Sequence, residues 1–149
     1  MKKCFMLIAF LCCAGSSFAT DHWQSKSQFG FSNYLLTNAQ QHKLILACNR
    51  NAGVQHDHSI SFIMDHAEYH NTARQTALVL KIDQNLSITP PATTTWRSDA
   101  DTWNQLKDAL AKANKIDVFL QGQHVSQFEP SLESIQSIAT EIHGCDANG

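Results

Sequence analysis

The sequence KLILAC, at residues 43–48, is apolar on both of the faces that alternate along an extended chain. That pattern is typical of a central strand that is covered on both sides. The next residues, 49–58, are polar and contain Gly53, which predicts a loop. SISFIM at residues 59–64 then alternates between polar and apolar side chains. A second strand is therefore expected after the loop.

Two more strands are expected downstream, at residues 77–82 and 86–88, on either side of the turn signal at residues 83–85. Four strands in this order, joined mostly by short loops, predict an antiparallel meander that ends at Pro90 and Pro91. Residues 20–40 fit either a first strand or a short helix around residues 34–36, and the sequence leaves both open.

The pattern changes period after residue 97. Residues 98–101, with the sequence SDAD, resemble a capping box that opens a helix at Ser98. The helix has one apolar stripe, formed by Trp103, Leu106, Leu110 and Ala113. Asn114 is a plausible end for it.

A hairpin and a second helix are expected at the C-terminal end. Residues 116–120 and 124–128 are strand-like on either side of Gly122. Pro130 suits the first position of the last helix, and Gly144 is expected as its left-handed stop. The apolar face of this helix is formed by Leu132, Ile135, Ile138, Ala139 and Ile142. The sequence thus predicts an α+β domain: an antiparallel sheet, made of a meander plus a C-terminal hairpin, packed with two helices.

Residues 1–19 have the features of a signal peptide. Two lysines precede a short apolar run, and Ser17 and Ala19 place small residues at the −3 and −1 positions of a cleavage site. Leu11 in front of Cys12 is a poor lipoprotein signal, which favours a protein without a lipid anchor. We therefore expect residues 20–149 to form one exported domain, either in the cell envelope or secreted.

Export would also change the cysteine count. Cleavage before Thr20 removes three cysteines and leaves Cys48 and Cys145. Two cysteines in an exported chain predict one disulfide. That bridge would join the end of the last helix to the exit of the central strand.

The charge of the exported part restricts its partners. Without the two leader lysines, nine of the eleven Lys and Arg remain against thirteen Asp and Glu, a net charge of −4. No run of basic residues is present, so nucleic acid and anionic membrane surfaces are not expected as partners. A mildly acidic surface suits a basic protein partner better.

The densest polar cluster lies between His56 and His70. His56 and His58 share a face if the chain is extended there, and His66 and His70 share a face if residues 65–70 form a helical turn. Either pair could supply two imidazole ligands to zinc, but neither has the spacing of a strong metal motif. A solvent-exposed loop rich in histidine is the simpler interpretation, so neither a metal nor another cofactor is expected.

Nothing in the sequence selects a catalytic group. No G-x-S-x-G motif is present, and the two remaining cysteines are better used in a bridge than as nucleophiles. No signature selects a pair of carboxylates for glycoside hydrolysis. The sequence therefore predicts a binding protein rather than an enzyme.

Three aromatic residues, Trp23, Tyr69 and Trp96, lie in polar or irregular stretches, unlike the aromatics on expected core faces. Exposed Trp and Tyr often anchor protein interfaces. The segments 90–97 and 49–58 are consequently the two best candidates for a surface that faces a partner.

The chain resembles the small periplasmic immunity proteins of type VI secretion, especially those that block a lysozyme-like domain carried on a secretion spike. The resemblance lies in the leader, in the strand LILACN (residues 44–49), in SISF (residues 59–62) and in the end at 135–145. It implies an antagonist that binds a secreted peptidoglycan hydrolase, often as a dimer, and blocks its active-site cleft.

Candidate partner-binding residues follow from this comparison. Arg50, His56 and His58 could pair with the carboxylates of a glycosidase cleft. Alternatively, Asp57 or Glu68 could contact a basic rim, and the sequence does not choose between the two. Tyr69 and Trp96 are the aromatic candidates. An envelope protein that binds a metal or ligand through the cluster from His56 to His70 is the alternative function.

Overall fold

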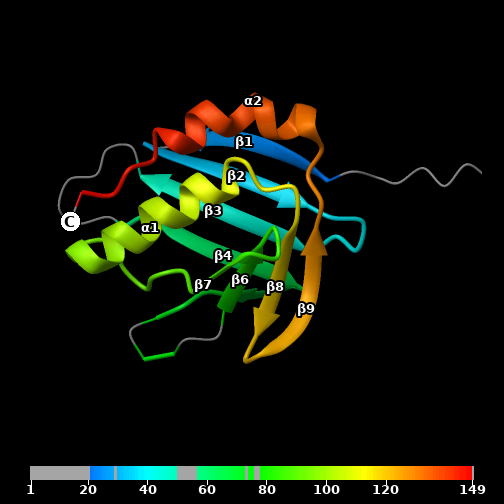
Figure 1. The fold of residues 1–149 in the computed structure, drawn as a ribbon, viewed down its shortest axis with the longest axis horizontal. Coiled ribbons are helices and arrows are strands. Elements are labelled where there is room, and N and C mark those ends of the chain that lie inside the picture. Colours follow the sequence, from blue (N-terminus) through cyan, green and yellow to red (C-terminus); the bar gives the residue numbers. More distant parts are fainter. Residues whose placement is uncertain (1–20, 29, 50–56, 73, 76–77, 149) are drawn as a thin grey trace, which may run out of the picture.

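The structure, a computed structural model, describes residues 21–28, 30–49, 57–72, 74–75 and 78–148. Helices and strands follow one another in this order: β1 (His22–Gln28), β2 (Phe31–Thr37), β3 (Lys43–Asn49), β4 (Ser59–Met64), β5 (Ala67–Tyr69), β6 (Leu78–Ile82), β7 (Leu86–Ile88), α1 (Arg97–Leu110), β8 (Ile116–Leu120), β9 (Gln123–Phe128) and α2 (Leu132–His143). The predicted α+β class is confirmed, with antiparallel sheets and two helices (Figure 1).

The first sheet is a five-stranded antiparallel meander in the order β1-β2-β3-β4-β5. The strand predicted from KLILAC is β3 and lies at its centre, and β4 has the predicted bounds. Residues 22–37, which the sequence left open, form a hairpin of two strands rather than a helix. The reason is visible in their burial, since Tyr34 and Leu36 point into the core while Leu35 between them lies on the outer face.

The second sheet has the order β7-β6-β8-β9, and its neighbouring strands are also antiparallel. Strands β6 and β7 were expected in the same meander as the earlier strands, but β6 pairs with β7 on one side and with β8 on the other. Alternation along a strand fixes which face is buried but does not select the neighbouring strand. The C-terminal hairpin is β8 and β9, as predicted.

Both predicted helices are present, but their ends differ from the prediction. Helix α1 begins after Trp96, so Ser98 lies inside the first turn and its carbonyl accepts a hydrogen bond from Thr102 instead of capping the helix. Helix α2 starts at Leu132 with the Ser131 hydroxyl as its N-terminal cap, so Pro130, predicted as the first helical residue, lies before the helix. Gly144 follows α2 with a φ of −73°, so the predicted left-handed stop is wrong.

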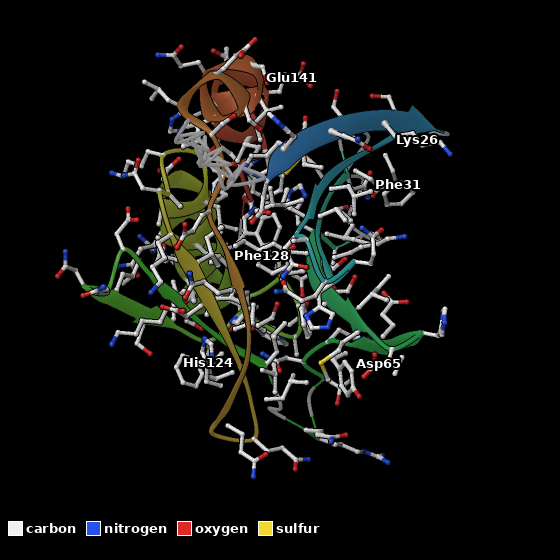
Figure 2. The ribbon with its side chains drawn as sticks, turned by 90° about the vertical axis from the view of Figure 1, so that its right-hand side faces the viewer. Lys26, Phe31, Asp65, His124, Phe128 and Glu141 are labelled. Atoms are coloured by element: carbon white, nitrogen blue, oxygen red, sulfur yellow. A yellow bond between two sulfur atoms is a disulfide. The ribbon has the colours of Figure 1, made fainter. Side chains whose placement is uncertain are left out.

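One core fills the space between the two sheets and the helices. Figure 2 shows Phe128 of β9 directed into it, and the ring of Phe128 meets Phe62 of β4 edge-on at 6.3 Å between centroids. Both rings are fully buried. Helix α2 runs beside β1, where the Ser134 hydroxyl accepts a hydrogen bond from the backbone N–H of Trp23. Trp23, expected in an exposed context, is therefore a core residue.

Asn38 ties the turn between β2 and β3 to β9 of the other sheet. Its side-chain amide donates to the Ser126 hydroxyl and to the Gln127 carbonyl. Its side-chain oxygen accepts from the backbone N–H groups of Gln40 and His42. One buried amide thus shapes the turn and connects the two sheets.

The predicted disulfide is confirmed. Cys48 at the end of β3 is bonded to Cys145 just beyond α2, with an S–S distance of 2.08 Å. Both cysteines are buried. The bridge therefore joins the central strand of the first sheet to the C-terminal segment.

None of the helices in the described ranges is both long and apolar enough to cross a membrane.

Candidate functional site

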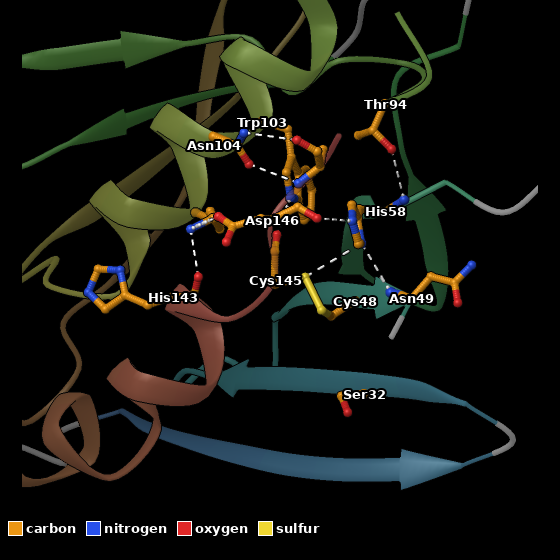
Figure 3. The surroundings of a disulfide bond; sticks show 12 residues. Ser32, Cys48, Asn49, His58, Thr94, Trp103, Asn104, His143, Cys145 and Asp146 are labelled. Atoms are coloured by element: carbon orange, nitrogen blue, oxygen red, sulfur yellow. Dashed lines mark hydrogen bonds and ion pairs between the residues drawn. A yellow bond between two sulfur atoms is a disulfide. The ribbon is translucent and has the colours of Figure 1, made fainter. Parts of the chain in front are cut away.

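The disulfide lies at one end of the domain, where segments from distant parts of the sequence meet. The C-terminus, the end of β3 and the start of α1 gather on the left of Figure 1, and Figure 3 shows the surroundings of the bridge. We call this region the disulfide end and define it by Cys48, Asn49, Asp57, His58, residues 93–97 and residues 145–147. It is the part of the described chain in which the most predicted site residues come together.

His58 is buried behind the bridge, and both of its ring nitrogens are hydrogen-bonded. The backbone N–H of Asn49 donates to Nδ1 at 3.1 Å, so Nδ1 carries no proton. Nε2 therefore carries the proton and donates to the Asp146 carbonyl at 3.0 Å. The ring also stacks on Trp103, with 5.1 Å between centroids and an interplanar angle of 11°. The prediction that His58 lies in an exposed loop and contacts a partner is wrong, because the ring nitrogens are held by backbone groups inside the domain.

Burial lowers the pKa of the His58 imidazole below its ordinary value. The hydrogen bond to the Asp146 carbonyl and the negative charge of Asp57 act in the opposite direction but do not cancel it. The imidazole is therefore neutral near pH 7, which agrees with the tautomer that its hydrogen bonds require.

Helix α1 holds the C-terminal segment through two side chains. The Trp103 indole N–H donates to the Cys145 carbonyl at 2.8 Å. The Asn104 side-chain amide donates to the Ala147 carbonyl at 3.1 Å, and the Asn104 side-chain oxygen accepts from the Ala147 backbone N–H at 2.9 Å. The segment beyond α2 is thus fixed by side chains as well as by the bridge.

Lys107 is a buried cation beside this segment. Its ammonium donates to the His143 carbonyl at 2.8 Å and lies 2.8 Å from the carboxylates of both Asp108 and Asp146. Burial would lower the pKa of Lys107, but the two carboxylates outweigh it and raise the pKa above its ordinary value. For Asp108, burial alone would raise the pKa of the carboxyl. Hydrogen bonds from Lys107 and His143 outweigh burial and leave this pKa below its ordinary value.

Thr94 joins the two segments that were predicted to face a partner. Its hydroxyl accepts from the backbone N–H of His58 at 3.1 Å. Its backbone N–H donates to the Asp57 carboxylate at 3.1 Å, and its hydroxyl donates to the same oxygen at 3.3 Å. Two residues further on, Trp96 is 71% exposed. Asp57 is therefore hydrogen-bonded to the segment that carries Trp96.

Other predicted site residues lie elsewhere. Glu68 is exposed on β5, opposite Ile63 of β4. Tyr69 is half-buried and its ring packs against Phe62 at 6.3 Å. Arg50 and His56 lie outside the described residues.

The predicted helical turn at residues 65–70 is wrong. Asp65 and His66 have positive φ angles of 51° and 66° and form a tight turn between β4 and β5. His66 is exposed in that turn and His70 is exposed after β5. No helix therefore brings the two side chains to one face. Among the described residues, the group of histidine, cysteine and acidic side chains close enough to share a metal is Cys48, His58 and Cys145.

Sequence reasoning missed Trp103, Asn104 and Lys107 as residues that build this end. Trp103 was expected only as core. Lys107 lies four residues after Trp103 and three before Leu110, so its position on the apolar stripe was the available signal. A lysine at such a position must find acceptors inside the protein.

We expect the free energy of unfolding to fall more steeply at acidic pH in the wild type than in Asp108→Asn. A carboxyl whose folded pKa is lowered contributes stability above its unfolded pKa, near 4, and loses that contribution as the pH falls through the folded value. Asp108 is half exposed, so Asp108→Asn should cost less than about 1 kcal/mol at pH 7. Denaturant titrations from pH 7 to pH 2.5 measure the difference.

The matched control is Asp101→Asn, an exposed aspartate on the same helix. Its stability should run parallel to the wild type across the pH range. A gap between wild type and Asp108→Asn that stays constant from pH 7 to pH 2.5 would contradict the assignment.

Comparison with known proteins gives a family for the chain. A family model described as YfjT matches residues 21–139. The "Uncharacterized protein YfjT" of Escherichia coli (strain K12) is 21% identical over 125 residues, which cover 83% of this chain and 81% of that protein. No solved structure matches. Because the family model spans most of the described domain, the chain belongs to the YfjT family.

Proposed function

We propose that the protein is a periplasmic immunity protein, which binds a secreted cell-wall-degrading toxin of the muramidase type and blocks its active site. The observation that carries the proposal is the exposed Trp96 on the rigidly held disulfide end. The proposal depends on export of residues 20–149, which the leader predicts.

Trp96 and its neighbour Arg97 have the chemistry of an interface anchor. Trp96 is 71% exposed at the start of α1, and Arg97 is exposed beside it. Trp and Arg are enriched among residues that dominate binding free energy. A partner that covers this indole would remove its apolar surface from water, which favours association.

The surroundings of Trp96 are ordered in advance of binding. Thr94 is fixed to Asp57 and His58, and the Thr93 hydroxyl contacts the Thr95 hydroxyl at 2.9 Å. A surface that is already ordered loses less conformational entropy on association. The polar groups of the disulfide end support this frame, because His58 uses both ring nitrogens within the protein.

The partner's chemistry follows from Arg97. Glycosidases use a pair of carboxylates in an elongated cleft. A guanidinium that reaches such a carboxylate forms strong charge-assisted hydrogen bonds, while the neighbouring indole covers the apolar wall of the sugar site. An inhibitor needs no reaction of its own to act in this way.

The test is capture of partners by the oxidised mature protein from cells that make their own secreted toxins. We expect a peptidoglycan hydrolase in a one-to-one or two-to-two complex, and loss of its cell-wall clearing activity on binding. A strain that lacks this gene should be lysed by siblings that carry the toxin. Normal resistance of that strain, or a captured hydrolase that stays fully active, would overturn the proposal.

Trp96→Ala should weaken inhibition of the captured hydrolase about thirtyfold, the effect of losing roughly 2 kcal/mol at a binding anchor. The stability of the free protein should be nearly unchanged, because the side chain is exposed. The dissociation constant, measured by calorimetry, gives the result.

Leu132→Ala is the matched control, since Leu132 on α2 is also a large exposed apolar side chain, at 67%. It should bind the hydrolase as the wild type does. Equal loss of affinity in both variants would mean that the disulfide end is not the binding surface.

A further inference from the structure

The bridge and His58 together form a group of three metal-binding atoms that the immunity function does not use. The sulfur atoms of Cys48 and Cys145 and a ring nitrogen of His58 all lie within 4.8 Å of one another. Nδ1 of His58 is 3.5 Å from the sulfur of Cys145 (Figure 3). All three residues are buried, with at most 5% of any of them exposed.

His58 is oriented as metal-binding histidines are. Such a residue typically donates its second ring N–H to a carbonyl or carboxylate, which fixes the tautomer and aims the free lone pair at the metal. Here Nε2–H donates to the Asp146 carbonyl at 3.0 Å, and the unprotonated Nδ1 is on the side of the sulfur atoms. Stacking on Trp103 fixes the plane of the ring.

We propose that reduction of the Cys48–Cys145 bridge turns this group into a buried three-coordinate site for Cu(I), with two thiolate sulfurs and Nδ1 of His58 as ligands. A dithiol reductant supplies two electrons and two protons, which break the S–S bond and give two thiols, while the dithiol closes to its own disulfide. Each thiol then releases its proton to solvent as its sulfur binds the metal.

The donor set selects the metal. Two thiolates and one imidazole are soft or intermediate ligands, and thiolates favour Cu(I). Structural zinc sites take four ligands in tetrahedral geometry, and this group offers three. Coordination takes the Nδ1 lone pair away from the Asn49 N–H, a single neutral hydrogen bond that two metal–thiolate bonds outweigh.

The site is controlled by the bridge, because the same sulfur atoms cannot hold both a disulfide and a metal. The oxidised protein should therefore not bind copper here. The reduced protein should bind one Cu(I) per chain and regain through the metal the connection between β3 and the C-terminal segment.

The experiment titrates the full mature protein with Cu(I) in competition with bicinchoninate, a chromophoric Cu(I) chelator. The protein is first reduced with a phosphine, which is then removed under anaerobic conditions. We expect the reduced wild type to withdraw one Cu(I) per chain from the chelator and the oxidised wild type to withdraw none. X-ray absorption on the copper-loaded wild type should show two sulfur ligands and one nitrogen.

Two variants test the histidine. His58→Gln should bind Cu(I) about tenfold more weakly or worse in the reduced state. His66→Gln, at an exposed histidine in the turn between β4 and β5, should bind as the wild type does. Circular dichroism of the oxidised variants checks their folding. If His58→Gln does not fold, the X-ray absorption spectrum of the copper-loaded wild type shows whether a nitrogen ligand is present.

Three results would overturn the inference. The reduced wild type could leave all copper on the chelator. The copper could have sulfur ligands alone, with unchanged affinity in His58→Gln. Zn²⁺, titrated in the same way against a chromophoric zinc chelator, could bind one-to-one and exclude Cu(I) from the site.

Discussion

Replacing both Cys48 and Cys145 with alanine is expected to lower the free energy of unfolding by roughly 4–5 kcal/mol. The two residues are 97 positions apart, so the bridge closes a loop that includes most of the domain. Without it, the unfolded chain gains the entropy of that open loop. The loss is comparable to the whole stability of a small domain.

Equilibrium denaturation with and without reductant measures this effect. The wild type should lose stability when a reductant is added, down to the level of the double variant, whereas the double variant should not respond. Alanine at both positions avoids the unpaired thiol that either single variant would leave. A double variant within about 1 kcal/mol of the oxidised wild type would contradict the prediction.

The loss should also have a local component at the disulfide end. Cys145 carries the carbonyl that Trp103 binds, and Ala147 is paired with Asn104. These hydrogen bonds depend on the position of the segment after α2, which the bridge fixes at one point. Amide hydrogen exchange in residues 145–147 should therefore increase more than exchange in the central strands of the first sheet.

The strands could be predicted because alternation of apolar side chains is a local property. Residues 43–48 and 59–64 gave β3 and β4 nearly to the residue, and the buried face of β4 is the expected one. Strand β3 was expected to be covered on both sides, but it buries only the face of Leu44, Leu46 and Cys48, while Ile45 and Ala47 on its other face are half-buried. The disulfide followed from counting the cysteines that an exported chain would retain. Each of these inferences needs only the pattern of neighbouring residues or the number of cysteines.

The division into two sheets and the burial of His58 depend on contacts between distant residues. Strand β6 pairs with β8, which follows it only after a whole helix, and nothing in the sequence of β6 specifies that partner. His58 lies in a polar stretch, which favours a loop, but Trp103 of α1 and Asp146 near the C-terminus bury it. Sequence patterns could not place these groups next to one another.

Phe128→Ala should cost about 3–5 kcal/mol of unfolding free energy, the usual loss for removing a buried aromatic ring. Phe128 is fully buried on β9 and meets Phe62 of β4 edge-on, so it fills the core where the two sheets face each other. Alanine leaves a cavity between the two sheets, which have no strand in common. Neither sheet can close this cavity without moving as a whole, because the core is closely packed.

Phe119→Ala is the matched control, because Phe119 lies on β8 of the same sheet but is half-buried and packs against His124 near the surface. It should cost less than about 2 kcal/mol, since much of its ring is in water already. Chemical denaturation followed by tryptophan fluorescence and by circular dichroism measures both variants.

A double-mutant cycle locates the effect between the sheets. Phe62→Ala, Phe128→Ala and the double variant should give a coupling energy of about 0.5–1.5 kcal/mol for the edge-on ring pair. If Phe128→Ala costs no more than Phe119→Ala, or if the two core substitutions are additive, Phe128 does not couple the sheets. A large cost with measurable coupling means that the two halves of the domain stabilise each other through this contact, and that the disulfide end rests on a core that both sheets build.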